Sequence, residues 1–130
     1  MGYSLVSFED GKYFGANVSG MQVVREVLQD GGFDFRQSQR RWTLDDFVAG
    51  GRCEKCKGLP KGEPAGRKVS IGMVLSANNA ELVTEKESRD MARATEKWLK
   101  THSHSEDRSF VRLFYRFVKD ASTRGGFFVL

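Results

Sequence analysis

A row of apolar side chains near the C-terminus is the feature that most constrains how this chain can fold. The row follows the spacing of three and four residues that places side chains on one face of a helix, through Phe110, Leu113, Phe114, Phe117 and Val118. Burying such a face is strongly favourable, so the helix must cover an apolar surface built by the rest of the chain. Gly125 and Gly126 are expected to end the helical region.

Other segments predict the strands of a small sheet. Residues 1–16 read as a hairpin around Asp10-Gly11, a dipeptide that readily adopts positive φ. Residues 68–76 alternate apolar and polar or mixed positions, which predicts a central strand. The final Phe-Phe-Val-Leu is too apolar to remain in water and is expected to add a strand.

Capping residues predict the remaining helices. Ser19 is expected to start a helix over residues 20–30, ended by Gly31-Gly32. Thr84 and Glu87 form a capping-box pattern ahead of a longer helix. Thr43 is expected to cap a short one. These elements predict an α+β fold, in which a mainly antiparallel sheet of hairpin, central strand and C-terminal strand packs with about three helices.

A length of 130 residues suits one domain, 1–130, with a single core. Residues 50–67 hold both prolines and several glycines without apolar periodicity, so we expect an irregular basic loop there.

No stretch has the ~20 apolar residues of a membrane helix. The first residues lack the pattern of a signal peptide, which favours a cytoplasmic protein.

All cysteines and histidines of the chain occur in two close pairs, Cys53 with Cys56 and His102 with His104. Two thiolates and two imidazoles are a closed tetrahedral ligand set for zinc, so the pairs predict a structural zinc site. Unliganded thiols and a polar helix connection are the alternative. A redox pair is disfavoured, because the residues after Cys56 do not predict the helix that lowers a thiol pKa in redox proteins.

Positive charge is concentrated in the middle of the chain, where residues 36–68 hold nine basic and four acidic side chains. Such a segment attracts phosphate backbones or an acidic protein surface, although a merely solvated loop has the same composition. Trp42 beside arginines is also suited to base stacking, and equally to a place in the core. The residues expected to contact a macromolecule are Arg36, Arg40, Arg41, Trp42, Arg52, Lys55, Lys57 and Lys61.

Two segments resemble parts of small uncharacterised proteins of bacteria and their phages. Residues 11–21 (GKYFGANVSGM) are similar to their opening stretch, and residues 114–120 (FYRFVKD), with the later GGFF at 125–128, to their closing stretch. Residues 53–58 (CEKCKG) are similar to the C-x-x-C-x-G knuckles of these proteins, although His102-Ser103-His104 stands where a second cysteine knuckle is often found. The resemblance implies a bacterial or phage protein and no particular activity.

The sequence contains none of the common hydrolase, nucleotide-binding or zinc-protease motifs. We therefore expect a non-catalytic macromolecule-binding protein, an inhibitor or adaptor that acts on an acidic protein surface or a nucleoprotein complex. Direct DNA or RNA binding through the same basic residues is the alternative. A thiol-dependent enzyme using Cys53 or Cys56 is a lesser one. The oligomeric state stays open.

Overall fold

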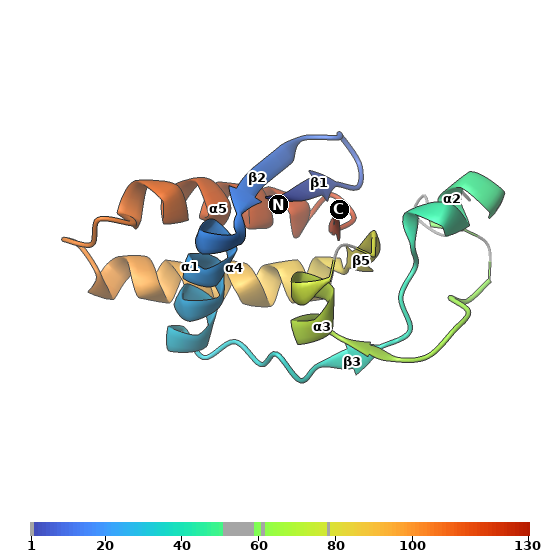
Figure 1. Ribbon diagram of the computed structural model, residues 1–130, viewed down its shortest axis with the longest axis horizontal. Coiled ribbons are helices and arrows are strands. Elements are labelled where there is room, and N and C mark those ends of the chain that lie inside the picture. The colour runs from blue at the N-terminus through green and yellow to red at the C-terminus, as the bar shows by residue number, and fades with distance from the viewer. Residues whose placement is uncertain (1, 51–58, 61, 78) are drawn as a thin grey trace.

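The computed structural model describes residues 2–50, 59–60, 62–77 and 79–130. These residues form an α+β fold, with a four-stranded antiparallel sheet and a separate two-stranded ribbon (Figure 1). The predicted fold class is therefore confirmed. The elements, in chain order, are β1 (Gly2–Ser7), β2 (Tyr13–Asn17), α1 (Val18–Asp30), β3 (Ser38–Gln39), α2 (Leu44–Gly50), β4 (Val69–Ser70), α3 (Ile71–Ser76), β5 (Glu81–Val83), α4 (Glu85–Thr101), α5 (Arg108–Ala121) and β6 (Phe127–Val129).

The main sheet has the order β2-β1-β6-β5, and every neighbouring pair is antiparallel. The predicted hairpin forms β1 and β2, with Gly11 at φ 71° in its turn. The predicted C-terminal strand also forms, and β6 lies between β1 and β5 rather than at an edge. The two ends of the chain are thus paired side by side at the centre of the sheet.

One face of the sheet is covered by α1, α4 and α5, and the main core lies between them. The predicted face of α5 contributes Phe114 and Val118 to this core, and both are buried. Phe14 of β2 packs against α5, with its ring centroid 5.6 Å from that of Phe114. Leu113 is the exception to the prediction, because it lies at the margin of the buried face and remains 56% exposed.

The other face of the sheet carries a smaller apolar cluster. Phe8, Leu82 and Phe128 are buried there, and Trp42 and Phe47 pack against them. Phe47 comes from α2, and its ring meets that of Phe128 at 88° with 5.4 Å between centroids. This cluster fixes the segment between β3 and α2 to the sheet.

The predicted N-cap residue is found at the start of α4, whereas that of α1 lies two residues earlier than predicted. The capping box of α4 forms as predicted, with Thr84 and Glu87 bonded to each other's backbone N–H. For α1 the cap is Asn17 and not Ser19, because the Asn17 side chain accepts the N–H of Gly20 at 2.8 Å and extends the helix by two residues. No helix within the described ranges has the length and apolar character needed to cross a membrane.

The predicted central strand over residues 68–76 is wrong beyond its first residues. Only Val69 and Ser70 are extended, and α3 follows. The Ser70 side chain accepts the N–H of Met73 and so caps the helix, which a strand prediction overlooks. Ile71, Val74 and Leu75 are buried together, so apolar positions that alternate in sequence also satisfy helical spacing.

Replacing Gly126 tests how closely the backbone just before β6 approaches β5. Gly126 has φ 84°, and a Cβ there would lie 1.9 Å from the Val83 carbonyl oxygen. We expect Gly126→Ala to lower the free energy of unfolding by about 3–5 kcal/mol, from backbone strain and overlap with the β5 backbone. Urea unfolding measures the change.

The matched control is Gly32→Ala, because Gly32 has φ 82° and no atom within 4 Å of the added methyl group. This variant carries the cost of positive φ alone, about 1 kcal/mol. Equal losses in the two variants would contradict the close approach of residue 126 to β5.

Candidate functional site

A buried ion pair forms the base of the candidate site. The guanidinium of Arg41 is bonded to both carboxylate oxygens of Glu87, at 2.7 Å each. Both side chains are 1% exposed. Arg41 also donates from Nε to the carbonyl of Val69, at 2.9 Å, and from Nη1 to the carbonyl of Leu82, at 3.0 Å. One side chain thus joins β4, β5 and the first turn of α4.

The environment of Glu87 stabilises its charged form. Burial raises the pKa of the Glu87 carboxyl, but the hydrogen bonds and charge of Arg41 act against this. The N–H of Thr84 and the side chain of Gln39 act in the same direction, and the pKa ends below its usual value. The Glu87 carboxyl therefore stays ionised in the core at neutral pH.

The prediction that Arg41 contacts a macromolecule is corrected by this geometry. Its side chain is enclosed, and its hydrogen bonds are made to Glu87 and to backbone carbonyls. Nothing in the sequence indicates that Arg41 is buried, because its carboxylate partner Glu87 lies 46 positions away in α4. Glu87 was recognisable only as a capping residue.

A hollow opens beside Trp42, above the small apolar cluster. It has a volume of about 400 Å³, and its surface is mainly apolar. Three predicted contact residues, Arg40, Arg41 and Trp42, line it. Charged residues of the first turn of α4 also belong to its lining. The full lining is Phe8, Gln39, Arg40, Arg41, Trp42, Leu59, Pro64, Leu82, Thr84, Glu85, Lys86 and Gly125.

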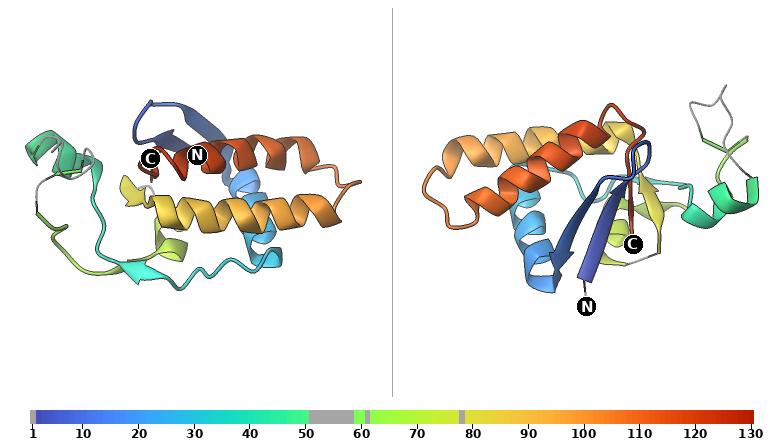
Figure 2. Two further views of the ribbon diagram at one scale, coloured as in Figure 1. Left: turned by 180° about the vertical axis from the view of Figure 1, so that it is seen from behind. Right: turned by 90° about the horizontal axis from the view of Figure 1, so that it is seen from above.

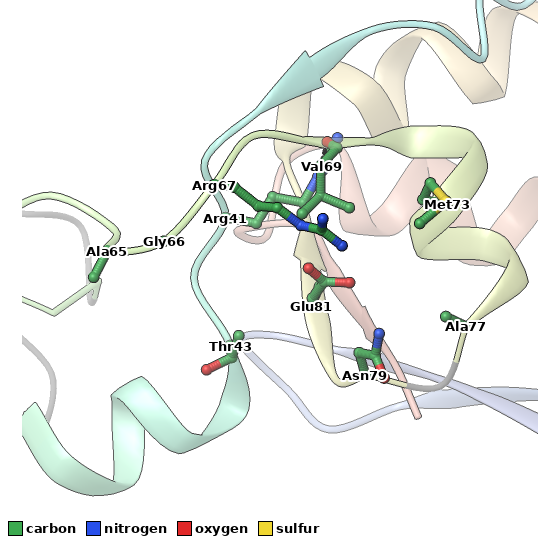
Figure 3. Close-up of a pocket in the computed structure, with 10 residues that line it drawn as sticks. All are labelled: Arg41, Thr43, Ala65, Gly66, Arg67, Val69, Met73, Ala77, Asn79 and Glu81. Carbon is green, nitrogen blue, oxygen red and sulfur yellow. Dashed lines mark hydrogen bonds between the residues drawn. The ribbon is translucent and has the colours of Figure 1, made fainter.

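A second pocket, of about 250 Å³, adjoins this hollow and shares Arg41 with it. It lies between residues 65–67 and the connection from α3 to β5 (Figure 3). Figure 3 shows the side chains of Arg67, Glu81 and Asn79 directed into it. We call the hollow and this pocket together the Trp42 face.

Basic side chains of the Trp42 face differ in whether they are neutralised. Among the described residues, Arg40 and Arg67 are exposed and form no ion pair, whereas Arg41 is fully paired. Lys68 follows Arg67 and lines neither pocket, and it too is exposed with no ion pair to a described residue. Arg36 lies outside both pockets, and its guanidinium is 3.4 Å from the Asp34 carboxylate. Arg67 and Lys68 belong to the basic segment of residues 36–68, but the sequence did not predict that they contact a macromolecule. Four predicted contacts fall outside the described residues: Arg52, Lys55, Lys57 and Lys61.

The predicted zinc ligands are only partly described. His102 ends α4, where its ring stacks on Trp98 at 4.3 Å and its Nδ1 lies 2.9 Å from the Trp98 carbonyl oxygen. His104 is exposed in the connection to α5. Cys53 and Cys56 lie outside the described residues. Within the described ranges no three His, Cys, Asp or Glu side chains converge as metal ligands.

The described neighbours of the cysteine segment lie far from the two histidines. Leu59 lines the hollow with Glu85, at the start of α4, whereas His102 follows its last residue. A helix of 17 residues is about 25 Å long, and Figure 1 shows the α4–α5 connection and α2 at opposite ends of the molecule. Cys53 and Cys56 themselves are outside the described residues, so the metal prediction and the thiol-enzyme alternative stay untested.

Comparison of the chain with protein-family models, curated proteins and solved structures finds no match. What bears on function is therefore the arrangement of charge and cavities around Arg41.

Removing the Arg41 side chain tests its bracing role. We expect Arg41→Met to lower the free energy of unfolding by about 3–5 kcal/mol, because it leaves the Glu87 carboxylate buried without its partner. The double variant Arg41→Met/Glu87→Met should recover most of that loss, since no buried charge remains. Arg36→Met is the control and should leave stability nearly unchanged, because the pair it breaks is exposed. An equal effect of the Arg41 and Arg36 substitutions would contradict the bracing role.

The ion pair also predicts how stability depends on pH. Because the pKa of Glu87 is lower in the folded chain than the ordinary value of about 4.3, its contribution is complete above that pH. The contribution is lost as the pH falls through the folded-state pKa. The variant Glu87→Gln lacks this titrating group. Its free energy of unfolding should therefore fall less steeply between neutral pH and strong acid than that of the unaltered chain. Parallel pH profiles for the two proteins, measured by urea unfolding, would contradict this.

Proposed function

We propose that this chain is a non-catalytic binding protein that holds an acidic protein surface on the Trp42 face. The observation that carries the proposal is the contrast among its basic residues. Arg41 is neutralised inside the fold, whereas Arg40, Arg67 and Lys68 remain exposed without ion pairs to other described residues. Arg40 lines the apolar hollow and Arg67 lines the second pocket. An apolar hollow with an unpaired cation in its wall suits a partner that brings both carboxylates and an apolar side chain.

The hollow suits the insertion of a partner side chain. Its walls are formed by rings and aliphatic groups of Phe8, Trp42, Leu59 and Leu82, and its volume of about 400 Å³ accommodates a large side chain. The walls are held by hydrogen bonds, since the N–H of Leu82 donates to the carbonyl of Trp42 at 2.8 Å. A preformed site of this kind loses little entropy when a partner binds.

The titratable groups around the hollow support binding rather than catalysis. Glu85 accepts the N–H of Gly125 at 3.1 Å, and Lys86 forms an ion pair with Asp90 at 3.5 Å. The guanidinium of Arg41 is occupied by Glu87. These groups serve as structural contacts, and the proposal assigns no reaction to them.

The position of Trp42 favours protein over nucleic acid as the partner. Its ring is half-buried against the cluster on the sheet and lies 6.4 Å from the Phe47 ring at 61°. A tryptophan that packs into a core presents less ring face to an unstacked base. Direct nucleic-acid binding is the second candidate, because Arg40, Arg67 and Lys68 would also contact phosphates.

A peptide-binding experiment tests the proposal. The probe is a short fluorescein-labelled peptide in which one phenylalanine is flanked by aspartates and glutamates, and fluorescence anisotropy measures its affinity. We expect the triple variant Arg40→Ala/Arg67→Ala/Lys68→Ala to bind about tenfold more weakly than the unaltered chain, through loss of three exposed charge contacts.

The matched control removes the same charge from α4, by Arg89→Ala/Arg93→Ala/Lys97→Ala, and should change the affinity less than about twofold. Equal weakening by both triple variants would contradict a site on the Trp42 face.

Random duplex and single-stranded DNA are tested in the same assay across a salt series. Tighter binding of DNA than of the peptide, with a steep loss of affinity as salt rises, would replace the proposal by the nucleic-acid alternative.

A further inference from the structure

The second pocket, of about 250 Å³, is kept open by the buried side chain of Arg41. The Arg41 Nε donates to the carbonyl of Val69 in β4, and its Nη1 donates to the carbonyl of Leu82 in β5. In the described part of the chain, β4 and β5 belong to different sheets and do not pair with each other. One guanidinium therefore holds the two strands at a fixed separation, and the pocket beside them is preformed.

Side chains of opposite charge are directed into this pocket. Figure 3 shows Arg67 entering it from the segment before β4, and Asn79 and Glu81 from the opposite wall, as Figure 2 shows the chain between α3 and β5 beside the sheet. None of these three side chains forms a hydrogen bond or ion pair with another described residue. Their donors and acceptors are therefore free for a ligand.

Ala80, between Asn79 and Glu81, has a backbone conformation that residues with a Cβ seldom adopt. Its φ is 55°, the one positive value among the described residues other than glycine. Its N–H donates to the carbonyl of Val129 and its carbonyl accepts the N–H of Leu44, at 3.0 Å each. These bonds fix the turn that carries Asn79 and Glu81, and strained backbone of this kind is concentrated at ligand-binding sites.

The rest of the pocket wall is largely apolar. Val69, Met73 of α3 and Ala77 contribute to it. Met73 is 52% exposed, so an apolar group bound in the pocket would remove part of its side chain from water. A flexible thioether also adapts to the shape of what it covers. The volume is small for a ligand pocket, which favours a compact ligand with one apolar part.

We propose that this pocket binds a small zwitterion, an α-amino acid with an aliphatic side chain. An anion alone would face the carboxylate of Glu81, and a cation alone would face the guanidinium of Arg67. A ligand with both charges satisfies both groups. Arg67 binds the ligand carboxylate through two parallel hydrogen bonds. Glu81 and the side-chain oxygen of Asn79 accept from the ammonium group, and the aliphatic part lies against the apolar wall.

The test uses L-leucine as the probe, and NMR spectra of the backbone amides measure its binding. We expect saturable shifts at residues 66–69 and 79–81, with a Kd of about 1 mM or below. Leucinamide lacks the carboxylate and isocaproate lacks the ammonium group. Each analogue should bind at least about tenfold more weakly, because it leaves one charged side chain of the pocket without a partner.

The variant Glu81→Gln keeps the size of the side chain and removes the charge that receives the ammonium group. It should weaken L-leucine binding about tenfold and tighten isocaproate binding, a reversal that a loss of folding would not produce. Glu26→Gln removes an exposed carboxylate from α1 and is the matched control. Arg40→Ala alters the hollow and not this pocket. Both should leave the affinity for L-leucine unchanged.

Equal affinities for L-leucine and isocaproate, or no saturable shifts at residues 66–69 and 79–81, would overturn the zwitterion site. The acidic peptide that tests the Trp42 face is measured on the same protein. Loss of peptide binding with L-leucine binding retained would overturn the proposed function alone. Peptide binding without L-leucine binding would overturn the zwitterion site alone.

Discussion

The pairing of Arg41 with Glu87 joins the two-stranded ribbon to the main sheet and to α4. The ribbon of β3 and β4, the edge strand β5 and the first turn of α4 all bond to one guanidinium. A buried pair stabilises a fold only if each remaining polar atom is satisfied, and here backbone carbonyls and the capping box supply those partners. The buried charge of Arg41 is thus neutralised, and its hydrogen bonds fix the position of the segment that carries the Trp42 face.

Bracing of this kind matters because the Trp42 face is built mostly from irregular chain. Short loops have few hydrogen bonds of their own, so their shape depends on attachment to regular elements. The carbonyl of Trp42 is bonded to β5, and its ring packs on the cluster under the hollow. The exposed arginines next to it thereby gain a defined position, which a binding surface requires.

The sheet gives the molecule two different edges. Beside β5 the chain covers its own edge, and the covering segment carries the hollow. Beside β2 the edge has no described neighbour strand, and Arg116 and Phe117 of α5 share a pocket with Tyr13 there.

Several elements could be predicted because their signals are local. The hairpin turn at Gly11, the capping box at Thr84 and the apolar face of α5 each depend on residues close in sequence. The errors share another cause. Over residues 68–76 the apolar positions fit both strand and helical spacing, and Ser70 decided for a helix. Leu113 fits the helical row, but it lies at the margin of the buried face and remains 56% exposed.

The sequence by itself determined the class of fold, the hairpin, the long helices and the excess of positive charge in the middle of the chain. It could not determine which basic residues carry that charge to the surface. The tertiary structure decided this, because the carboxylate that neutralises Arg41 is brought from α4, whereas Arg40 and Arg67 form no ion pair with any described residue. It also decided that residues 42–44 lie along β5, while no described strand pairs with the outer side of β2. Both outcomes depend on contacts between residues distant in sequence, and the local patterns of a single chain do not record such contacts.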